Sequence, residues 1–224
     1  MDQETNITLC CPSRGRPEYA KRMQNSAFAT ATNPNNIKVK FYLNEDDPML
    51  KQYDVIDSEI GIDRSTVMSW NMLAEKERSR MYMLVGDDAE FITTGWDRIF
   101  LQQYRKYPDG IFMIGTATGK KHGLENQTSP HPVITREWRE ALGYFWPFQF
   151  HHWCLDNYTN DLAKAVDRYI FMEDVMIKVK KITKDDTAQR IRTKSVHERD
   201  KWVYEKTKQC YFNHDVEKLK KAMQ

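Results

Sequence analysis

The chain has 224 residues, enough for one domain with a substantial core or for one domain and a small appendage. Hydrophobic residues make up 40% and charged residues 29%, as in an ordinary globular protein, and no apolar stretch approaches the ~20 residues that cross a bilayer. A formal net charge of +2 excludes a uniformly polycationic protein. We therefore predict one globular domain over residues 1–224, with no membrane partner.

The N-terminal segment and the cysteines favour a cytoplasmic protein. Residues 1–6 are polar and acidic, so we expect no secretory signal. Cys10 and Cys11 are neighbours in an apolar run, and a strand would place them on opposite faces. They indicate neither a disulfide framework nor a zinc site, which favours a reducing, intracellular compartment.

Short apolar runs alternate with amphipathic segments through most of the chain. Pro17 favours a helix start, because proline suits the first helical position, and Glu18 suits the positive end of the helix dipole. The alternation predicts an α/β fold with a mainly parallel, Rossmann-like sheet flanked by helices on both faces. The predicted strands are 7–11, 37–43, 81–85 and 111–115, and the predicted helices are 17–32, 65–80, 96–106 and 159–168.

Three loops that follow predicted strands carry polar or charged side chains, namely residues 12–16, 44–47 and 86–90. Ligands of parallel α/β sheets bind at the carboxyl ends of the strands, so we expect these loops to form one ligand site. In the first loop, Gly15 permits a tight turn and the following helix offers free N–H groups to an anion. Arg14 and Arg16 are equally compatible with phosphate binding and with a plain connection that carries solvated arginines.

Asp87 and Asp88 directly follow a hydrophobic strand. Two adjacent carboxylates at a strand end need a cation or hydrogen-bond donors to offset their charge, and oxygen ligands suit Mg²⁺ or Mn²⁺. Only one of the two would bind the ion directly, because neighbouring side chains of an extended segment point to opposite faces. An ordinary turn with two aspartates is the competing interpretation.

A basic stretch lies between Lys178 and Lys208, with eleven Lys and Arg against five Asp and Glu. Such a run is either a solvated surface or a face for a polyanion such as nucleic acid. The second interpretation predicts that Lys180, Lys181, Arg190 and Arg192 contact DNA phosphates.

Together these motifs resemble the GT-A glycosyltransferases, with the strongest likeness to small family 2-type enzymes, many of them encoded by bacteriophages. The resemblance extends over residues 7–181 and rests on segments 12–17, 44–47, 86–91, 95–97, 131–136 and 153–161. It implies a single GT-A domain with a nucleotide-sugar-binding half (1–115), an acceptor half (116–180) and a basic, peripheral helical segment (181–224).

The resemblance also implies roles for particular residues on the donor side. Asp88 is the expected metal ligand, assisted by Asp87, with Mn²⁺ or Mg²⁺ as the cofactor. Lys178 stands where similar enzymes often place a metal-binding histidine, so either Lys178 contacts the diphosphate directly or His122 or His197 supplies the ligand. The residues expected to bind the nucleotide are Pro12, Ser13, Arg14, Arg16, Asn44, Glu45, Asp46, Arg64 and Asp87.

On the acceptor side the resemblance implies that Asp156 is the catalytic base, with His131 and Trp153 as further acceptor contacts. A hydroxyl needs a positioned proton acceptor as it attacks the sugar, which fits a carboxylate at this place. The competing interpretation is that Asp156 only caps the helix predicted over 159–168. Asp161 is the alternative base, but we expect it inside the first turn of that helix.

The predicted function is metal-dependent, inverting transfer of a sugar from a nucleotide-sugar donor, a UDP-sugar in the first instance, to an acceptor hydroxyl. The phage-type likeness, the basic stretch and the aromatic residues Phe145, Trp146, Phe148 and Trp153 favour a modified base of double-stranded DNA, in the host cytoplasm, as acceptor. The alternatives are an enzyme of glycan or lipopolysaccharide synthesis and a non-catalytic nucleic-acid-binding module with the same fold.

Overall fold

The computed structural model describes residues 5–55, 57–119, 128–180 and 185–224. In these residues eight strands form one sheet in the order β3-β2-β1-β4-β7-β6-β8-β5. The strands are β1 (Thr5–Ser13), β2 (Ile37–Asn44), β3 (Ser58–Gly61), β4 (Ser79–Leu84), β5 (Ala89–Phe91), β6 (Met113–Ala117), β7 (Val133–Thr135) and β8 (Tyr169–Val179).

Most neighbouring strands in the sheet are parallel, as the sequence predicts. β1 pairs in parallel with β2 and β4, β2 with β3, and β6 with β8. β7 runs antiparallel between β4 and β6, and β5 runs antiparallel to β8. The carboxyl ends of β1, β2, β4 and β8 therefore meet along the same edge of the sheet.

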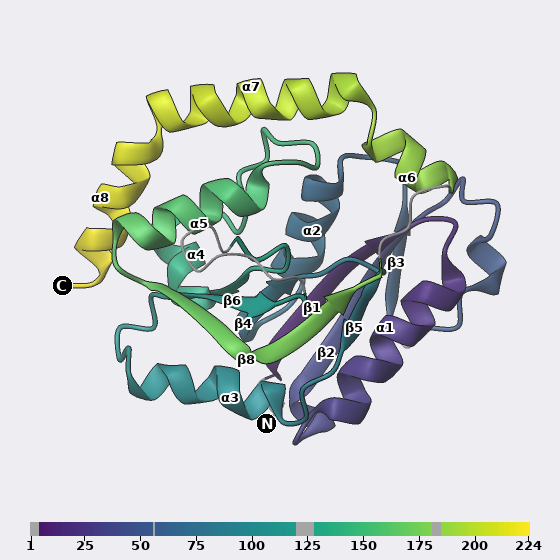
Figure 1. The fold of residues 1–224 in the computed structure, drawn as a ribbon, viewed down its shortest axis with the longest axis horizontal. Helices are drawn as coiled ribbons and strands as arrows, with labels where there is room; N and C mark the ends of the chain where they lie inside the picture. The colour runs from purple at the N-terminus through teal and green to yellow at the C-terminus, as the bar shows by residue number, and fades with distance from the viewer. Residues whose placement is uncertain (1–4, 56, 120–127, 181–184) are drawn as a thin grey trace.

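Helices cover both faces of the sheet (Figure 1). One face carries α1 and α3, and the other carries α2, α4 and α5, with α7 crossing outside them. The α-helices are α1 (Pro17–Thr30), α2 (Thr66–Glu75), α3 (Trp96–Leu101), α4 (Arg136–Leu142), α5 (Leu155–Ala165), α6 (Asp186–Ile191), α7 (Lys194–Cys210) and α8 (Phe212–Ala222).

The sheet separates two hydrophobic cores, and β1 contributes to both because its side chains alternate between faces. Leu9 and Cys11 are buried in the core beneath α1 and α3. Cys10 is buried in the other core, beside Trp70 of α2 and Trp138 of α4. Cys10 and Cys11 are free thiols on opposite faces, as predicted, and burial raises the pKa of both well above the usual value of a thiol.

Two predicted helices end earlier than their apolar spacing suggests. The helix predicted over 65–80 begins after Ser65, whose side chain accepts the Met68 N–H, but it ends at Glu75. The residues after it are bound to β4 instead, since the Tyr82 hydroxyl donates to the Glu77 carbonyl and accepts from Ser79 N–H. The helix predicted over 96–106 tightens into a 3-10 helix from Gln102 to Arg105.

The segment after residue 184 is helical, as predicted, but it is more than a peripheral addition. Asp200 of α7 and Asp215 of α8 are both buried. Asp215 accepts hydrogen bonds from the hydroxyls of Tyr144 (2.5 Å) and Tyr158 (2.9 Å), which ties α8 to α5 and to the segment before it. In the part of the chain that the structure describes, no helix has both the length and the apolar character needed to span a membrane.

Candidate active site

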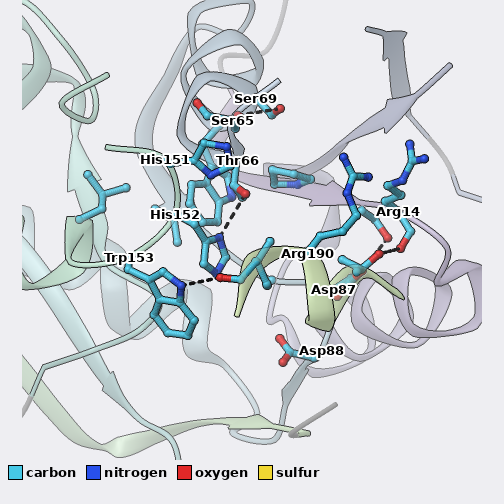
Figure 2. Close-up of a pocket in the computed structure, with 18 of the residues that line it drawn as sticks. Arg14, Ser65, Thr66, Ser69, Asp87, Asp88, His151, His152, Trp153 and Arg190 are labelled. Carbon is cyan, nitrogen blue, oxygen red and sulfur yellow. Dashed lines mark hydrogen bonds between the residues drawn. The ribbon is translucent and has the colours of Figure 1, made fainter. Parts of the chain in front are cut away.

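A cavity of about 810 Å³ opens at the carboxyl ends of β1, β2, β4 and β8. Figure 2 shows the acid pair Asp87 and Asp88 on one side of this cavity and His151, His152 and Trp153 on the other. The cavity brings together most of the residues singled out from the sequence. Those that line it are Pro12, Ser13, Arg14, Arg16, Asn44, Arg64, Asp87, Asp88, His131, Trp153 and Asp156.

Asp87 is buried, and both of its carboxylate oxygens have partners. One accepts a hydrogen bond from the Ser13 hydroxyl at 2.7 Å, and the other lies 3.1 Å from Nη1 of Arg16. Burial nevertheless raises the pKa of Asp87 to about 6, against the opposing effect of Arg16. Asp87 therefore fastens the β4 end to the β1 end.

Asp88 differs from its neighbour because no side chain of the described residues donates a hydrogen bond to its carboxylate. Its backbone carbonyl accepts from Lys180 N–H at 2.8 Å, which joins the acid pair to the end of β8. Burial raises the pKa of the Asp88 carboxyl, while the charges of Arg16, Arg192 and Arg22 lower it. Asp88 is the carboxylate of the pair that is left for a ligand.

A divalent cation beside Asp88 would need oxygen atoms of a bound phosphate and of water in addition to the protein carboxylate. Among the described residues no group of three or more His, Cys, Asp or Glu side chains forms a metal site. Asp88 offers carboxylate oxygens to the cavity, whereas those of Asp87 are occupied. Mg²⁺ and Mn²⁺ are commonly held by one or two carboxylates together with phosphate oxygens and water, and Asp88 fits that kind of site.

Arg16 links the acid pair to the C-terminal segment. Its Nε and Nη2 donate to the two carboxylate oxygens of Asp185 at 2.6 and 2.7 Å, while Nη1 faces Asp87. Thr187 adds a hydrogen bond from its hydroxyl to the Arg14 carbonyl at 2.7 Å. We predicted that Arg16 binds the nucleotide. The structure places it in the cavity lining, but with its guanidinium already engaged by two carboxylates.

The second loop, at the end of β2, contributes less to the cavity than predicted. Asn44 lines it and donates to Asp63 at 2.7 Å, but Glu45 and Asp46 are exposed and lie outside its lining. Asp46 instead forms an ion pair with Arg14. The reason is the turn itself, which directs Asp47 inward, where its carboxylate accepts the N–H of Gly15 at 2.7 Å.

Three further arginines reach the cavity, two of them from α6 and its C-terminal end. Arg64 donates from Nε to the Tyr42 hydroxyl at 3.0 Å, and Arg190 forms an ion pair with Asp63. Arg192 lines the cavity without a hydrogen-bond or ion-pair partner for its side chain among the described residues. Arg190 and Arg192 thus line the same cavity as Asp88, and their predicted contact with DNA phosphates stays a prediction. Lys180 is exposed, and Lys181 lies outside the described residues.

Asp156 faces the cavity from the first turn of α5, which begins at Leu155. The predicted helix start at 159 was therefore too late, and Asp156 is not its N-cap. That position belongs to Cys154, whose φ of 64° is unusual for a residue with a side chain. Burial raises the pKa of Asp156 to about 6, although backbone N–H groups of the first turn favour its charged form. Asp161 lies in the second turn, bound to Lys208 and Tyr204.

The other residues that were predicted on the acceptor side, together with His152, give this part of the cavity uncharged rings. His131 is buried, neither ring nitrogen has a hydrogen-bond partner among the described residues, and burial lowers its pKa to about 4. Burial also lowers the pKa of His152 to about 4, and its Nδ1 lies 3.1 Å from the Thr66 hydroxyl. The Trp153 indole donates to the Ile191 carbonyl at 2.6 Å, so α6 also contacts this side.

The remaining sequence predictions fall outside the cavity. Lys178 is an exposed residue of β8 that does not line the cavity, and its contact with a diphosphate stays a prediction. His197 packs edge-on against Trp153 outside the lining, and His122 lies outside the described residues. The predicted aromatic cluster is dispersed: Phe145 and Trp146 are core residues, Phe148 is 74% exposed, and only Trp153 reaches the cavity.

Sequence reasoning missed several residues of the site that come from distant segments. Each belongs to a charged stretch whose local pattern is typical of an ordinary solvated surface. The Ser, Thr and Asp residues at the starts of α6 and α7 are helix-capping signals. They do not indicate which surface of the protein these helices pack against. The missed residues are Asp63, Asp185 and Thr187, while Arg190 and Arg192 were expected only as contacts to DNA phosphates.

The raised pKa of Asp156 predicts a pH-dependent effect on folding. Its folded pKa of about 6 exceeds the ~3.9 of an unfolded aspartate, so the native state holds the extra proton and loses stability as pH rises from about 4 to about 6. The free energy of unfolding of Asp156→Asn should therefore be about 1–2 kcal/mol higher than that of wild type at pH 7. At pH 4 the two proteins should differ little. Urea denaturation at both pH values measures this. A variant less stable at pH 7 would show that the carboxylate supports the helix start.

Comparison with known proteins identifies the fold. No protein-family model and no curated protein sequence matches the chain. Among solved structures, S. aureus TarS 1–349 in complex with UDP matches at a TM-score of 0.59 and 10% identity, over 77% of this chain and 59% of that one. TarS 1–349 in complex with UDP-GlcNAc matches at a TM-score of 0.65 and 9% identity, over 96% of this chain and 70% of that one.

A third similar structure is the mannosyltransferase PcManGT from Pyrobaculum calidifontis in complex with GDP-Man and Mn²⁺. It matches at a TM-score of 0.54 and 12% identity, over 99% of this chain and 74% of that one. The fold of this protein is thus the GT-A fold of nucleotide-sugar glycosyltransferases, as predicted. The chain spans about three fifths of the length of the first TarS structure, and the bacteriophage subtype stays a prediction.

Proposed function

We propose that the protein is a metal-dependent glycosyltransferase that moves a sugar from a nucleotide-sugar donor, a UDP-sugar in the first instance, to an acceptor hydroxyl with inversion. The observation that carries this proposal is a single cavity at the strand ends of a GT-A fold, with Asp88 on one side and Asp156 on the other. The solved neighbours were captured with UDP, UDP-GlcNAc and GDP-Man, which supports a nucleotide sugar as the donor class.

The donor would lie against the strand ends, with its diphosphate between Asp88 and the arginines of α6. Mn²⁺ or Mg²⁺ held by Asp88 would neutralise charge on the diphosphate. Arg192, and Arg190 once it releases Asp63, supply guanidinium groups that can fork onto phosphate oxygens. Ser13 and Arg16 keep Asp87 in place beside them and so hold the end of β4 fixed.

On the acceptor side, Asp156 would take the proton of the attacking hydroxyl. A pKa of about 6 leaves the carboxylate mostly ionised near neutral pH, yet more basic than an ordinary aspartate. The hydroxyl oxygen then bonds to the anomeric carbon as the bond to the diphosphate breaks. Attack from the side opposite the leaving group inverts the configuration.

A glycan hydroxyl is the acceptor that we propose, in preference to a modified DNA base. Three sequence features favoured DNA, and two of them lose weight in the structure: Arg190 and Arg192 line the cavity, and Phe145 and Trp146 belong to the core. The third, the bacteriophage-type likeness, stays a prediction. The rings of His131, His152 and Trp153 suit stacking on a neutral sugar. DNA binding at low salt with transfer to hydroxymethylated duplexes would reverse this preference.

The role of Arg192 can be separated from the surrounding positive charge. Arg192→Gln should weaken donor binding by roughly 10–100-fold, because a charged hydrogen bond contributes about 1.5–3 kcal/mol. Lys180→Gln is the matched control, since Lys180 is also exposed and basic but packs over the Tyr19 ring outside the cavity. Isothermal titration with UDP-sugar and Mn²⁺ provides the affinities. Equal losses in the two variants would indicate a general charge effect and remove Arg192 from the site.

The proposed function is tested by screening UDP- and GDP-sugars by thermal shift with and without Mn²⁺, followed by transfer assays. A ligand at 100 times its dissociation constant stabilises the folded state by about 2.7 kcal/mol, which such a screen detects. Metal-dependent donor binding with release of nucleoside diphosphate is the expected result. A protein that binds no nucleotide sugar, or that binds nucleic acid and never cleaves a donor, would favour the non-catalytic alternative.

A further inference from the structure

Three consecutive backbone N–H groups converge on one buried carboxylate beside the cavity. Asp200 of α7 is fully buried, and its Oδ1 accepts from His151 N–H at 2.9 Å. Its Oδ2 accepts from the N–H groups of His152 and Trp153, both at 2.7 Å. The Arg199 guanidinium donates from Nη1 to Oδ1 of Asp200 at 2.9 Å and so balances the charge of the carboxylate. A carboxylate that accepts several charge-assisted bonds holds its donors more strongly than neutral pairs would.

The segment that Asp200 holds, residues 151–153, supplies one wall of the cavity. All three side chains line it, and the Trp153 indole is fixed in turn by the Ile191 carbonyl. Cys154 follows with a φ of 64°, and Asp156 comes two residues later in the first turn of α5. A left-handed residue with a side chain costs of order 1 kcal/mol or more and persists only where its surroundings determine it. The hydrogen bonds of Asp200 to residues 151–153 hold the backbone immediately before Cys154 in place.

A second buried aspartate in the same C-terminal segment provides a contrast. Asp215 also accepts from the acceptor half, through the hydroxyls of Tyr144 and Tyr158. None of these three residues lines the cavity. Asp215 therefore joins α8 to the core, whereas Asp200 acts on the backbone that leads directly into Asp156.

We propose that Asp200 is a positioning residue for the acceptor side: by binding the N–H groups of residues 151–153 it sets the His152 and Trp153 side chains and the start of α5 that carries Asp156. The proposal rests on the proposed function for its kinetic consequence. The donor would lie at the strand ends on the other side of the cavity, away from Asp200.

The experiment compares Asp200→Asn with Asp215→Asn in the full chain. An asparagine keeps the shape but has one acceptor oxygen, and its amide group would face backbone donors. In Asp200→Asn we expect faster hydrogen exchange at residues 151–153, an unchanged dissociation constant for UDP-sugar, and a loss of roughly 10–100-fold in kcat/KM for the acceptor. In Asp215→Asn we expect a loss of thermal stability, without faster exchange at 151–153 and without the kinetic loss.

Unchanged exchange at 151–153 in Asp200→Asn would overturn the proposal, as would an equal kinetic loss in Asp215→Asn. If Asp200→Asn does not fold, Asp200→Glu keeps both acceptor oxygens but displaces them by one methylene group, and should show the same effects in weaker form. Hydrogen exchange does not depend on turnover. If wild type transfers no sugar, the exchange result still decides the structural claim, so failure of the proposed function is recognised separately.

Discussion

Replacing Asp156 by asparagine is expected to lower transfer by roughly 10²–10⁴-fold, the range typical of a lost general base, while donor binding stays unchanged. Asparagine keeps the size of the side chain in the first turn of α5 but cannot take a proton. The wild-type kcat/KM should also fall as pH drops below about 6, because protonation of Asp156 removes the base. Steady-state kinetics between pH 5 and 8, with donor affinity measured separately, test both statements.

Asp161→Asn is the matched control for this variant. Asp161 lies on the same helix, but its carboxylate binds Lys208 and Tyr204 and does not line the cavity. It should keep wild-type turnover, with at most a modest loss of stability because its ion-pair partner Lys208 is exposed. Wild-type kinetics in Asp156→Asn, or an equal loss in Asp161→Asn, would show that Asp156 is not the base.

Asp88→Ala should remove metal-dependent donor binding, with a loss of at least roughly 100-fold in the affinity measured with Mn²⁺. Changes in residues that merely support metal ligands cost 10–100-fold, and loss of a direct ligand should cost no less. The fold should survive, since no side chain of the described residues depends on this carboxylate for a hydrogen bond. Titration of UDP-sugar with Mn²⁺ and with EDTA gives the metal-dependent part of the affinity.

Glu90→Gln serves as the control for Asp88, because Glu90 lies two residues further along in β5, opposite Lys178, and does not line the cavity. Its donor affinity should match wild type in both Mn²⁺ and EDTA. Asp88 would lose its assignment if a folded Asp88→Ala protein kept the difference between the Mn²⁺ and EDTA titrations.

The positions of the strand ends, and so the place of the site, could be predicted from the local sequence pattern. An apolar run that stops at Pro12 or at Gly86 locates a strand end to within two residues, and parallel strands bring those ends to one edge. The pattern does not resolve single positions inside a turn. Asp46 and Asp47 are adjacent acids, yet one is exposed and the other accepts an inward N–H, because the chain reverses between them.

The residues that sequence analysis could not assign are held by tertiary contacts. Arg16 and Asp185 are 169 positions apart, and each alone looks like a surface charge. Arg192 looks like part of a basic surface until α6 is placed against the ends of β1 and β2. The early end of α2 at Glu75 is similar, since the competing bonds of Tyr82 to residues 77 and 79 form only when β4 joins the sheet.

The ion pair between Arg16 and Asp185 also implies an order in which the cavity is assembled during synthesis. The first four strands can pair while the ribosome is still translating the acceptor half, because their partners lie within the first 84 residues. The cavity wall supplied by α6 and α7 arrives only after residues 185–200 have left the exit tunnel. A nascent chain would therefore hold paired strands β1 to β4 with an open edge, and the cavity would be completed only after α6 and α7 have emerged.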